Sequence, residues 1–240
     1  SINVHSDILE ADFHGEFEFA TLTDAMKEII PRFLPSVILP KKNFTANQNF
    51  SFDIRLKNMN LISELFLPSW DISSGTSLKG RFNSINHQLK LDLSSPSVTY
   101  KKLVLNDISG KVNAGESVMQ LDVQAGELTK DEKPMVELPA VHAMAGSDRV
   151  DFIIQLADQD TFVNRAHLEG DMVFHSADKF DIHVDSSFIV IQKDLWKLNP
   201  KNQVLFDSLG ITFRDLQFFR DGQEISFNGK ITHSADELLK

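Results

Sequence analysis

Apolar and polar residues alternate almost without error over residues 9–19. The odd positions from Leu9 to Phe19 are apolar or glycine, and the even positions from Glu10 to Glu18 are acidic or histidine. A period of two places successive side chains on opposite faces of a β-strand. This segment therefore predicts a strand with one apolar face and one polar face.

The same alternation returns many times along the chain. It recurs at residues 50–57, 89–93, 119–125, 152–156, 168–174, 180–184 and 227–231. Parallel strands are buried on both faces and form continuous apolar runs, whereas clean alternation is typical of antiparallel sheet. We therefore predict an all-β, mainly antiparallel fold.

One segment near the start departs from this pattern and predicts a short helix over residues 22–34. Thr21 is the predicted N-cap, with Asp24 three residues on, and apolar residues then recur at helical spacing. Pro31 should kink or end this helix just before it. A second short helical turn is predicted at residues 61–66.

Residues 129–149 are polar at their start and contain Pro134 and Pro139, so they predict an internal loop. The same strand pattern lies on both sides of this loop. Residues 1–240 are therefore predicted to form one β-rich segment with a continuous sheet. The chain begins with Ser and residues 2–5 already have strand character, so we expect it to be a piece of a longer protein.

A weak repeat places glycine on the apolar side of strands. The pattern apolar-x-Gly-x-apolar includes five of the 11 glycines: Gly15, Gly80, Gly110, Gly170 and Gly229. Glycine inside a strand marks a bend, a bulge or the close approach of another group. A sheet bent repeatedly at these glycines would curl around its apolar face and form a groove.

The amino-acid composition excludes several classes of binding partner for this predicted groove. The 19 Phe far outnumber the 2 Trp and the single Tyr, which favours dry apolar contact over contact with sugars. The net charge of −10 argues against binding to nucleic acid or to an anionic membrane surface. The absence of cysteine excludes disulfides and thiolate chemistry, and no apolar run is long enough for a membrane-spanning helix.

No group of residues in the sequence indicates catalysis. None of the common nucleophile, phosphate-binding or zinc-protease motifs occurs, and the Asp131-Glu132 pair lies in a polar stretch. His167, His175 and His183 are spaced by eight, but they occupy the polar side of their strands and should face solvent. We therefore predict a non-enzyme without a catalytic site, metal or cofactor.

Two stretches carry a resemblance to a known family. Near the C-terminus they are Trp196–Pro200, Leu209–Phe218 and the run Asp221–Ile231, which reads DGQEISFNGKI. Near the N-terminus they are Ala20–Lys27 and the run Arg32–Pro35, which reads RFLP. The chain resembles the TamB family, a branch of the AsmA-like bacterial envelope proteins, in the form found in Bacteroidetes.

The resemblance implies a β-taco, a long curled sheet that forms a trough with an apolar interior. It also implies a periplasmic protein, anchored in the inner membrane by a segment outside this chain. Such proteins are implicated in phospholipid movement to the outer membrane and in outer-membrane protein assembly. The expected partners are therefore phospholipid acyl chains and an outer-membrane β-barrel assembly protein.

The leading hypothesis is a groove that shields and conducts lipid. Its predicted lining is Phe13, Phe17, Phe19, Phe50, Phe52, Ile54, Leu56, Leu89, Leu91, Leu93, Met119, Leu121, Val123, Phe152, Ile154, Leu156, Met172, Phe174, Phe180, Ile182, Val184, Phe213, Phe227 and Ile231. One alternative is a scaffold for protein assembly or secretion, which accepts partner strands at sheet edges near Val4 and Ile231. Another is a closed β-sandwich interaction domain whose apolar faces fill one another.

Overall fold

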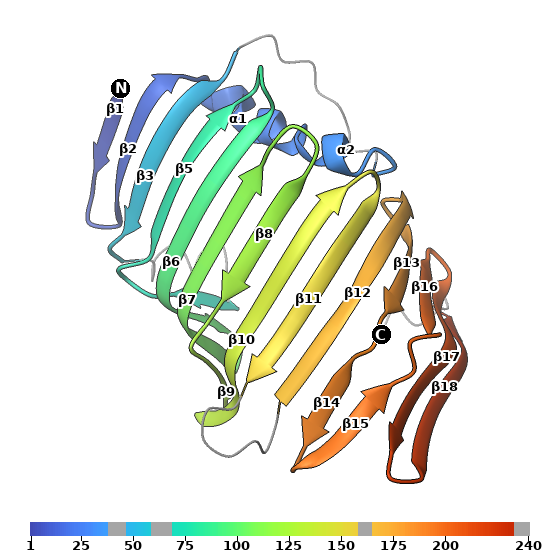
Figure 1. Ribbon diagram of the computed structural model, residues 1–240. Coiled ribbons are helices and arrows are strands. Elements are labelled where there is room, and N and C mark those ends of the chain that lie inside the picture. The colour runs from blue at the N-terminus through green and yellow to red at the C-terminus, as the bar shows by residue number, and fades with distance from the viewer. Residues whose placement is uncertain (38–46, 59–68, 158–164, 233–240) are drawn as a thin grey trace. The chain divides into compact units, whose positions relative to one another are not determined.

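The computed structural model describes residues 1–37, 47–58, 69–157 and 165–232. These residues form antiparallel β-sheet, with helices only between residues 19 and 33, which confirms the predicted all-β fold (Figure 1). The chain divides into two compact units: unit 1 holds residues 1–29 and 40–142, and unit 2 holds residues 30–39 and 143–240. The organisation of residues 1–240 as a single segment stays a prediction.

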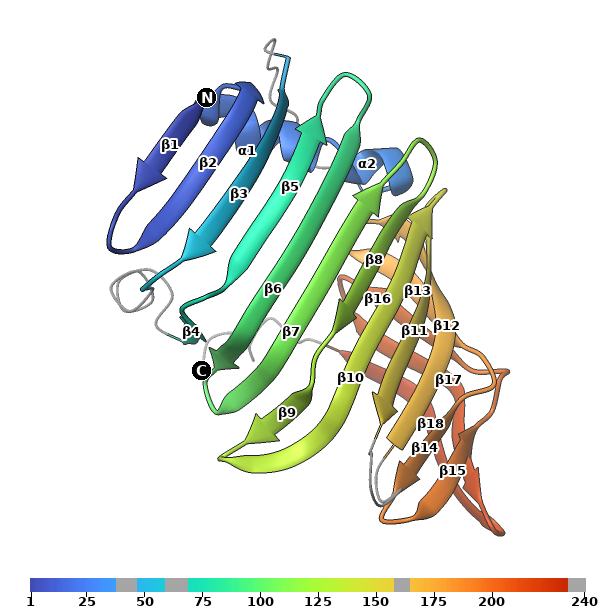
Figure 2. The ribbon, with the colours of Figure 1, turned by 60° about the vertical axis from the view of Figure 1, so that its left-hand side comes forward.

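Unit 1 is a sheet of sequential antiparallel strands (Figure 2). They are β1 (Ile2–His5), β2 (Leu9–Glu16), β3 (Asn49–Leu56), β4 (Trp70–Ile72), β5 (Ser77–Asn83), β6 (Gln88–Tyr100), β7 (Leu103–Ala114), β8 (Met119–Gln124), β9 (Glu127–Lys130) and the first part of β10 (Lys133–Gly146). The pairing runs β1–β2–β3–β5–β6–β7–β8. Strands β4 and β9 extend the same sheet on β6 and β7, and β10 pairs with β9.

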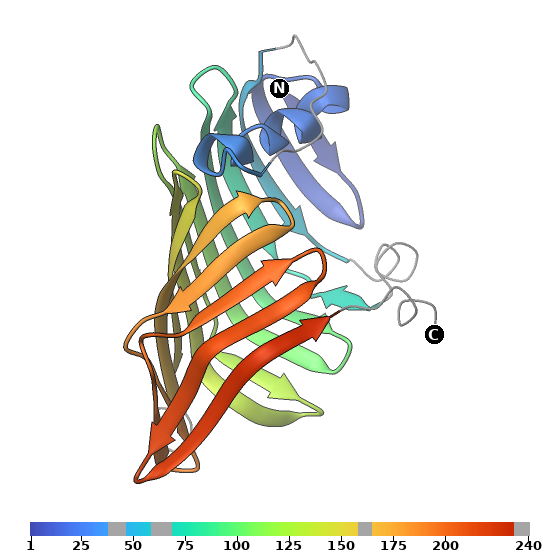
Figure 3. The same cartoon turned by 90° about the vertical axis from the view of Figure 1, so that its right-hand side faces the viewer.

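Unit 2 contains the rest of the described strands (Figure 3). They are the end of β10, β11 (Arg149–Ala157), β12 (Arg165–Ser176), β13 (Lys179–Val184), β14 (Phe188–Ile191), β15 (Asp194–Leu198), β16 (Gln203–Asp207), β17 (Gly210–Arg220) and β18 (Gln223–Thr232). The long strand β12 pairs with β11 on one side, and with β13 and β14 end to end on the other. The long strand β17 likewise pairs with β15 and β16, and with β18 on its other side.

The prediction of a loop over residues 129–149 is wrong, because β9, β10 and the start of β11 occupy this region. Asp131 and Glu132 both have positive φ, 49° and 62°, and form a two-residue turn that matches the twist of a β-hairpin. Proline removes a backbone donor but keeps its carbonyl, and the carbonyl of Pro139 accepts the N–H of Ala125 at 2.9 Å. Pro139 therefore fits inside a paired strand.

The predicted helix exists but begins earlier than expected. Helix α1 spans Phe19–Lys27, with Glu18 rather than Thr21 at its N-cap, so the predicted cap is wrong. The carbonyl of Glu18 accepts the N–H of Thr21 at 3.2 Å, and the Thr21 hydroxyl contacts the Glu18 carboxylate at 3.2 Å. Thr21 thus lies in the first turn and caps nothing.

The helix breaks at Glu28 and Ile29, and a one-turn helix α2 (Ile30–Phe33) follows. Pro31 lies in the first turn of α2. A backbone N–H in this turn has no acceptor within the helix, so proline, which lacks the N–H, removes no helical hydrogen bond. The predicted interruption near Pro31 is confirmed, although the first helix ends at Lys27. Helix α1 belongs to unit 1 and α2 to unit 2. The helical turn predicted at residues 61–66 lies outside the described residues.

A line of interruptions, here called the crease, crosses the strands of each unit. In unit 1 it passes through residues 73–76, 95–97, 106–107, 125–126 and 138–139; in unit 2 it passes through residues 185–187, 199–202 and 214–215. The interrupted strands still bond to one another there, for example Gly126 N–H to the carbonyl of Asn106 at 2.9 Å. Figure 3 shows the strands of unit 1 bending toward the side on which α1 lies.

The crease keeps the apolar side chains on one face. Strand β12 runs through without a break, so Ala166 and Gly170 lie on the same face. Their partners are Ile189 of β14 and Val184 of β13, one at an odd and one at an even position. The extra residues between β13 and β14 therefore change the parity of the sequence pattern and preserve the face.

Polar side chains replace the ladder hydrogen bonds that the crease removes. In unit 2 the Asn202 side chain, 1% exposed, accepts the N–H of Val184 at 3.1 Å and donates to its carbonyl at 2.6 Å. In unit 1 the hydroxyls of Thr76 and Ser95, 5% and 2% exposed, donate to the backbone carbonyls of Ser73 and Ser97 at 2.8 and 3.1 Å. Buried backbone groups need such partners, so these side chains determine where the sheet can bend.

The five repeated glycines all lie on apolar cross-strand rows, as predicted. The expectation that the sheet bends at each of them is wrong, because the strand register runs without a shift through Gly80 and Gly110. Gly80, Gly110 and Gly170 have no positive φ, and only Gly15 and Gly229 do. A Cβ at Gly80 would lie 2.5 Å from Cζ of Phe52 and 2.8 Å from Cδ2 of Leu91. This glycine makes room for the side chains of its cross-strand neighbours.

We predict opposite outcomes for two glycine substitutions. Gly80→Ala should lower the free energy of unfolding by about 1–3 kcal/mol, because the new methyl group overlaps the Phe52 ring. Gly110→Ala should cause no loss, because its Cβ would lie 3.5 Å from the nearest atom, on Leu93. Urea titration of both variants measures the difference, and equal destabilisation would contradict it.

Removal of the Asn202 side chain tests the crease. Asn202→Ala leaves the N–H and the carbonyl of Val184 unpaired and should cost about 1–3 kcal/mol of folding free energy. The matched control is Asn113→Ala, at an exposed position on the polar face of β7, with an expected effect within about 0.5 kcal/mol. Thermal unfolding compares the two, and an Asn202 variant as stable as the control would refute the role of the side chain.

Candidate functional site

The strand register of unit 1 assembles its apolar residues into rows across the sheet. The first row is Ile2, Phe13, Phe52, Gly80, Leu91, Val112 and Leu121. The second is Val4, Ala11, Ile54, Leu78, Leu93, Gly110 and Val123, and Leu9 pairs with Leu56 beyond it. The third is Gly15, Phe50, Phe82, Leu89, Ala114 and Met119. The predicted lining residues of this unit's strands thus share one face.

A further apolar row of unit 1 lies beyond the crease and is absent from the predicted lining. It comprises Ile72, Val98, Leu105, Leu128 and Val136. On β6 the apolar residues occupy odd positions up to Leu93 and even positions from Val98 onward. Because of this change, the sequence does not reveal that the apolar face continues past the crease. The Ser95-Pro96-Ser97 sequence inside this strand is the feature that could have indicated the change from odd to even apolar positions.

Unit 2 has the same organisation. One row is Val150, Met172, Ile182, Val204, Phe213 and Gly229, and the next is Phe174, Phe180, Phe206, Ile211 and Ile231. Others are Phe152, Gly170 and Val184; Ile154 and Leu168; Leu156, Ala166, Ile189 and Trp196; and Leu216 with Phe227. Phe206, Ile189 and Trp196 were missed from sequence because short strands beside the crease carry too few alternations.

Most side chains in these rows are only half-buried. In unit 1 Leu91, Val112 and Leu121 are intermediate in exposure, and Leu93 is 37% exposed. In unit 2 the row from Val150 to Phe213 is likewise intermediate throughout. Central strands of packed sheets bury such residues almost completely. Over most of its apolar face, each described sheet is a single layer.

The third row of unit 1 is the exception, because it is buried where α1 begins. Phe50, Phe82 and Leu89 are 3%, 0% and 8% exposed. The expectation that Phe17 and Phe19 continue the strand alternation is wrong, because β2 ends at Glu16 and Phe19 opens α1. Their rings still cover this end of the apolar face.

The phenylalanine rings at this end contact one another. The Phe17 ring lies 5.6 Å from Phe13 and 5.4 Å from Phe50, and Phe19 lies 5.5 Å from Phe13. The Phe13 ring in turn stacks on Phe52 at 6.1 Å. Phe50 and Phe52 belong to the buried core of unit 1, Phe13 and Phe17 are half-buried, and Phe19, 54% exposed, lies at the outer side of this phenylalanine cluster.

The opposite face of unit 1 carries charged residues in register, and their signs alternate from Asp53 on β3 to Asp122 on β8. One row is Asp12, Asp53, Lys79, Asp92, Lys111 and Asp122. Lys79 Nζ lies 3.0 Å from Asp53, and Lys57 Nζ lies 2.7 Å from Glu10. The hydrogen bond and charge of Lys57 lower the pKa of Glu10. Opposite charges on neighbouring strands favour this register over a slip, since a slip by one residue would reverse the faces.

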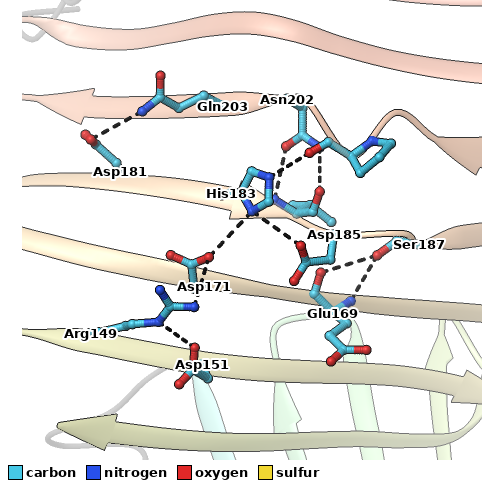
Figure 4. A network of polar contacts seen from close by, with 12 residues as sticks. Arg149, Asp151, Glu169, Asp171, Asp181, His183, Asp185, Ser187, Asn202 and Gln203 are labelled. Carbon is cyan, nitrogen blue, oxygen red and sulfur yellow. Dashed lines mark hydrogen bonds and ion pairs between the residues drawn. The ribbon is translucent and has the colours of Figure 1, made fainter.

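The polar face of unit 2 carries a network of ion pairs (Figure 4). Arg149 lies 2.7 Å from Asp151 and 3.4 Å from Asp171, and these carboxylates raise the pKa of its guanidinium group. His183 lies 3.5 Å from Asp171 through Nδ1, and its Nε2 lies 2.6 Å from the carbonyl oxygen of Pro200. The network joins β11, β12 and β13 and the loop before β16.

The three histidines of the sequence analysis lie on this polar face but do not converge. His167 contacts Glu169 at 3.7 Å, His175 contacts Asp181 at 3.2 Å, and His183 contacts Asp171. Within the described ranges, no cluster of three or more His, Asp or Glu side chains is arranged to hold a metal ion. No helix in the same ranges has the length and apolar character needed to cross a membrane.

Comparison of this chain with protein-family models, with curated proteins and with solved structures gives no match. The apolar face of each unit is therefore the candidate site on structural grounds alone.

We predict that the folded protein binds an apolar dye such as anilinonaphthalene sulfonate. A half-buried apolar face offers the dye a surface that a packed core lacks. Leu93→Asn should weaken dye binding, whereas Asp92→Asn on the opposite face of β6 should not. Fluorescence titration of native protein measures this, and emission that rises only on unfolding would contradict it.

Proposed function

We propose that the apolar faces hold lipid acyl chains, and that the protein shields and conducts phospholipid between the inner and outer membranes. The observation that carries this proposal is the set of continuous, half-buried apolar rows. Exposed apolar surface of this extent marks binding sites for lipid, membrane or protein. The regular one-sided pattern, without convergent polar groups or metal ligands on that face, favours a flexible apolar ligand over a small polar substrate.

The dimensions of the rows suit an acyl chain. The first row of unit 1 crosses six strands from β2 to β8, which spans roughly 24 Å at about 4.8 Å per strand. One leaflet of a bilayer has a hydrocarbon thickness of about half of 30 Å, so an extended tail fits along a row.

The driving force is burial of apolar surface. Each methylene moved from water onto the face contributes about 0.8 kcal/mol when fully buried. Because Leu, Ile, Val and Phe side chains follow one another without a specific polar contact, no position along the row binds much more tightly than the next. A uniform apolar wall of this kind retains a lipid tail and lets it slide.

The cellular setting follows from the resemblance to the TamB family and is part of the proposal. In this proposal the chain lies in the periplasm and belongs to a protein anchored to the inner membrane through a segment outside this sequence. The polar face, with its alternating carboxylates and lysines, suits contact with water. Phospholipid headgroups would remain at the margins of the apolar faces.

A second candidate function is a scaffold for outer-membrane protein assembly, and β18 favours it. All ten residues of β18 are exposed, and among the described residues its strand partner is β17. An exposed edge can accept a strand from a client protein. Pull-down of a β-barrel assembly component by this chain, lost on substitution of β18 with proline at Ser226, would favour this function over lipid conduction.

Leu121→Asp tests lipid binding in unit 1. The carboxylate would lie in the middle of the first row and should abolish lipid retention, because an acyl chain cannot solvate it. The matched control is Gln120→Asp, which places the same charge on the exposed polar face of β8. Native mass spectrometry of protein purified from membranes measures bound phospholipid, and lipid content equal in both variants would refute the groove.

Phe152→Asp tests lipid binding in unit 2, and it is also expected to destabilise the fold. The Phe152 ring lies over Gly170, where a Cβ would be 3.0 Å from Cζ, so this substitution also removes a packing contact. It should abolish lipid passage in a transfer assay between vesicles while the circular dichroism of the sheet persists. Gln155→Asp, on the polar face of β11, is the control, and transfer by the Phe152 variant at the control rate would contradict the proposal.

A further inference from the structure

The apolar face of unit 1 ends in a row of a different kind, two positions beyond Val98 on β6 and Leu105 on β7. This border row consists of Trp70, Tyr100, Leu103, Lys130 and Lys133, which pair in this order across β4, β6, β7, β9 and β10. Residues two apart on a strand share a face, and so do cross-strand partners. The apolar face therefore ends in exposed aromatic and cationic side chains.

The aromatic residues of the border row are of the kind that gathers where apolar and aqueous regions meet. Tyr100 is the single tyrosine of the chain, and its ring lies 4.6 Å from the ring of Trp70. Tyr and Trp combine an apolar ring with a polar group, and in membrane proteins they are enriched at the level of the lipid headgroups. Lys101 adds a cation at the same place, because its Nζ lies 5.1 Å from the centre of the Tyr100 ring.

The lysines of this border lie in two adjacent hairpin turns. Residues 100–103 connect β6 to β7, and residues 130–133 connect β9 to β10, at the same end of the sheet (Figure 2). The two turns contain four lysines and two carboxylates, in a chain whose net charge is −10. Lys102 Nζ lies 3.0 Å from Asp131 and joins the turns to each other. The border is thus a local region of positive charge.

Lys130 and Lys133 have no ion-pair partner in the part of the chain that the structure describes. Their charges therefore stay available to an anion from outside. The turns at the opposite end of the same strands, residues 84–87 and 115–118, contain no lysine or arginine. The positive charge thus marks one end of the apolar face, away from the phenylalanine cluster.

We infer that the border row binds the phosphate of a phospholipid whose acyl chains lie on the apolar rows toward the phenylalanine cluster. The inference rests on the proposed function of that face. Lys130 and Lys133 contact the phosphate through charge-assisted hydrogen bonds, and basic sites of this kind bind lipid headgroups. Trp70 and Tyr100 pack against the glycerol and the first methylenes, where the lipid changes from polar to apolar.

The length of the face suits this orientation. Seven residues of β6 separate Tyr100 from Leu93, which corresponds to roughly 23 Å at about 3.3 Å per residue. A lipid tail occupies about half of the 30 Å hydrocarbon core of a bilayer. A tail that starts at the border row therefore passes Val98 and ends on the apolar face.

Two soluble lipids with the same short acyl chains separate the phosphate from the tails. They are dihexanoyl phosphatidylglycerol and dihexanoylglycerol, which lacks the phosphate, and isothermal titration calorimetry measures both affinities. The wild-type protein should bind the phospholipid about tenfold more tightly. The double variant Lys130→Gln with Lys133→Gln should lose this preference and keep its affinity for dihexanoylglycerol.

The matched control is Lys90→Gln with Lys111→Gln, which removes the same charge from exposed positions on the polar face of β6 and β7 and should keep the preference. Equal affinity of the wild type for both lipids, or a preference that the Lys130 and Lys133 variant retains, would overturn the headgroup site and leave acyl-chain binding intact. Binding of neither lipid would overturn both proposals. Inorganic phosphate that binds as tightly as the phospholipid would reduce the border row to a site for free phosphate.

Tryptophan quenching tests the orientation of the lipid. Trp196→Phe leaves Trp70 as the single tryptophan, because the chain contains two. Phospholipid brominated near the glycerol should quench Trp70 more strongly than phospholipid brominated near the methyl ends of its tails. Equal or stronger quenching by the bromine at the methyl ends would overturn the placement of the headgroup at the border row.

Discussion

The backbone hydrogen bonds of the crease are the constraint on which each unit depends. A single-layer sheet can bend across its strands only where ladder bonds are given up, and every buried N–H and carbonyl must then find another partner. Asn202, Thr76 and Ser95 provide such partners from almost fully buried positions. Their hydrogen bonds let the sheet bend while the strands on both sides of the bend remain paired.

The crease also preserves the separation of faces that the candidate function requires. Leu216 and Phe218 continue the apolar face of Ile211 and Phe213 only because the bulge at residues 214–215 shifts the parity by one. Without that shift, the apolar residues of β17 beyond the bulge would face water. The half-buried rows thus cross the bend, and a bound acyl chain would meet apolar side chains on both sides of it.

A single-layer sheet lacks the second layer that usually buries an apolar face. Here Phe50, Phe52 and Phe82 supply a buried core at one end of unit 1, and most of the rest of the face stays half-exposed. Alternating charges on the other face hold the register. Lipid would complete the core that the protein leaves open, so binding and stability are expected to be coupled.

The sequence predicted the strands where the period of two persists for three or more alternations, as in β2, β3 and β12. It failed where turn residues interrupt a strand without ending it. Residues 129–149 looked like a loop because Pro139 and the Asp131-Glu132 turn are typical of loops, yet Pro139 needs only its carbonyl in β10. The lining residues beyond the crease, such as Val98 and Trp196, were not predicted. The change between odd and even apolar positions at the crease depends on tertiary hydrogen bonds, which no local sequence pattern encodes.

The most direct measurement of the central claim uses Trp196, which shares a row with Ile189 on the apolar face of unit 2. The variant Trp70→Phe leaves Trp196 as the single tryptophan, because the chain contains two. Phospholipid brominated on its acyl chains should quench Trp196 fluorescence strongly, and phospholipid without bromine should not. Bound brominated lipid that leaves the emission of Trp196 unchanged would contradict the placement of acyl chains on the apolar face.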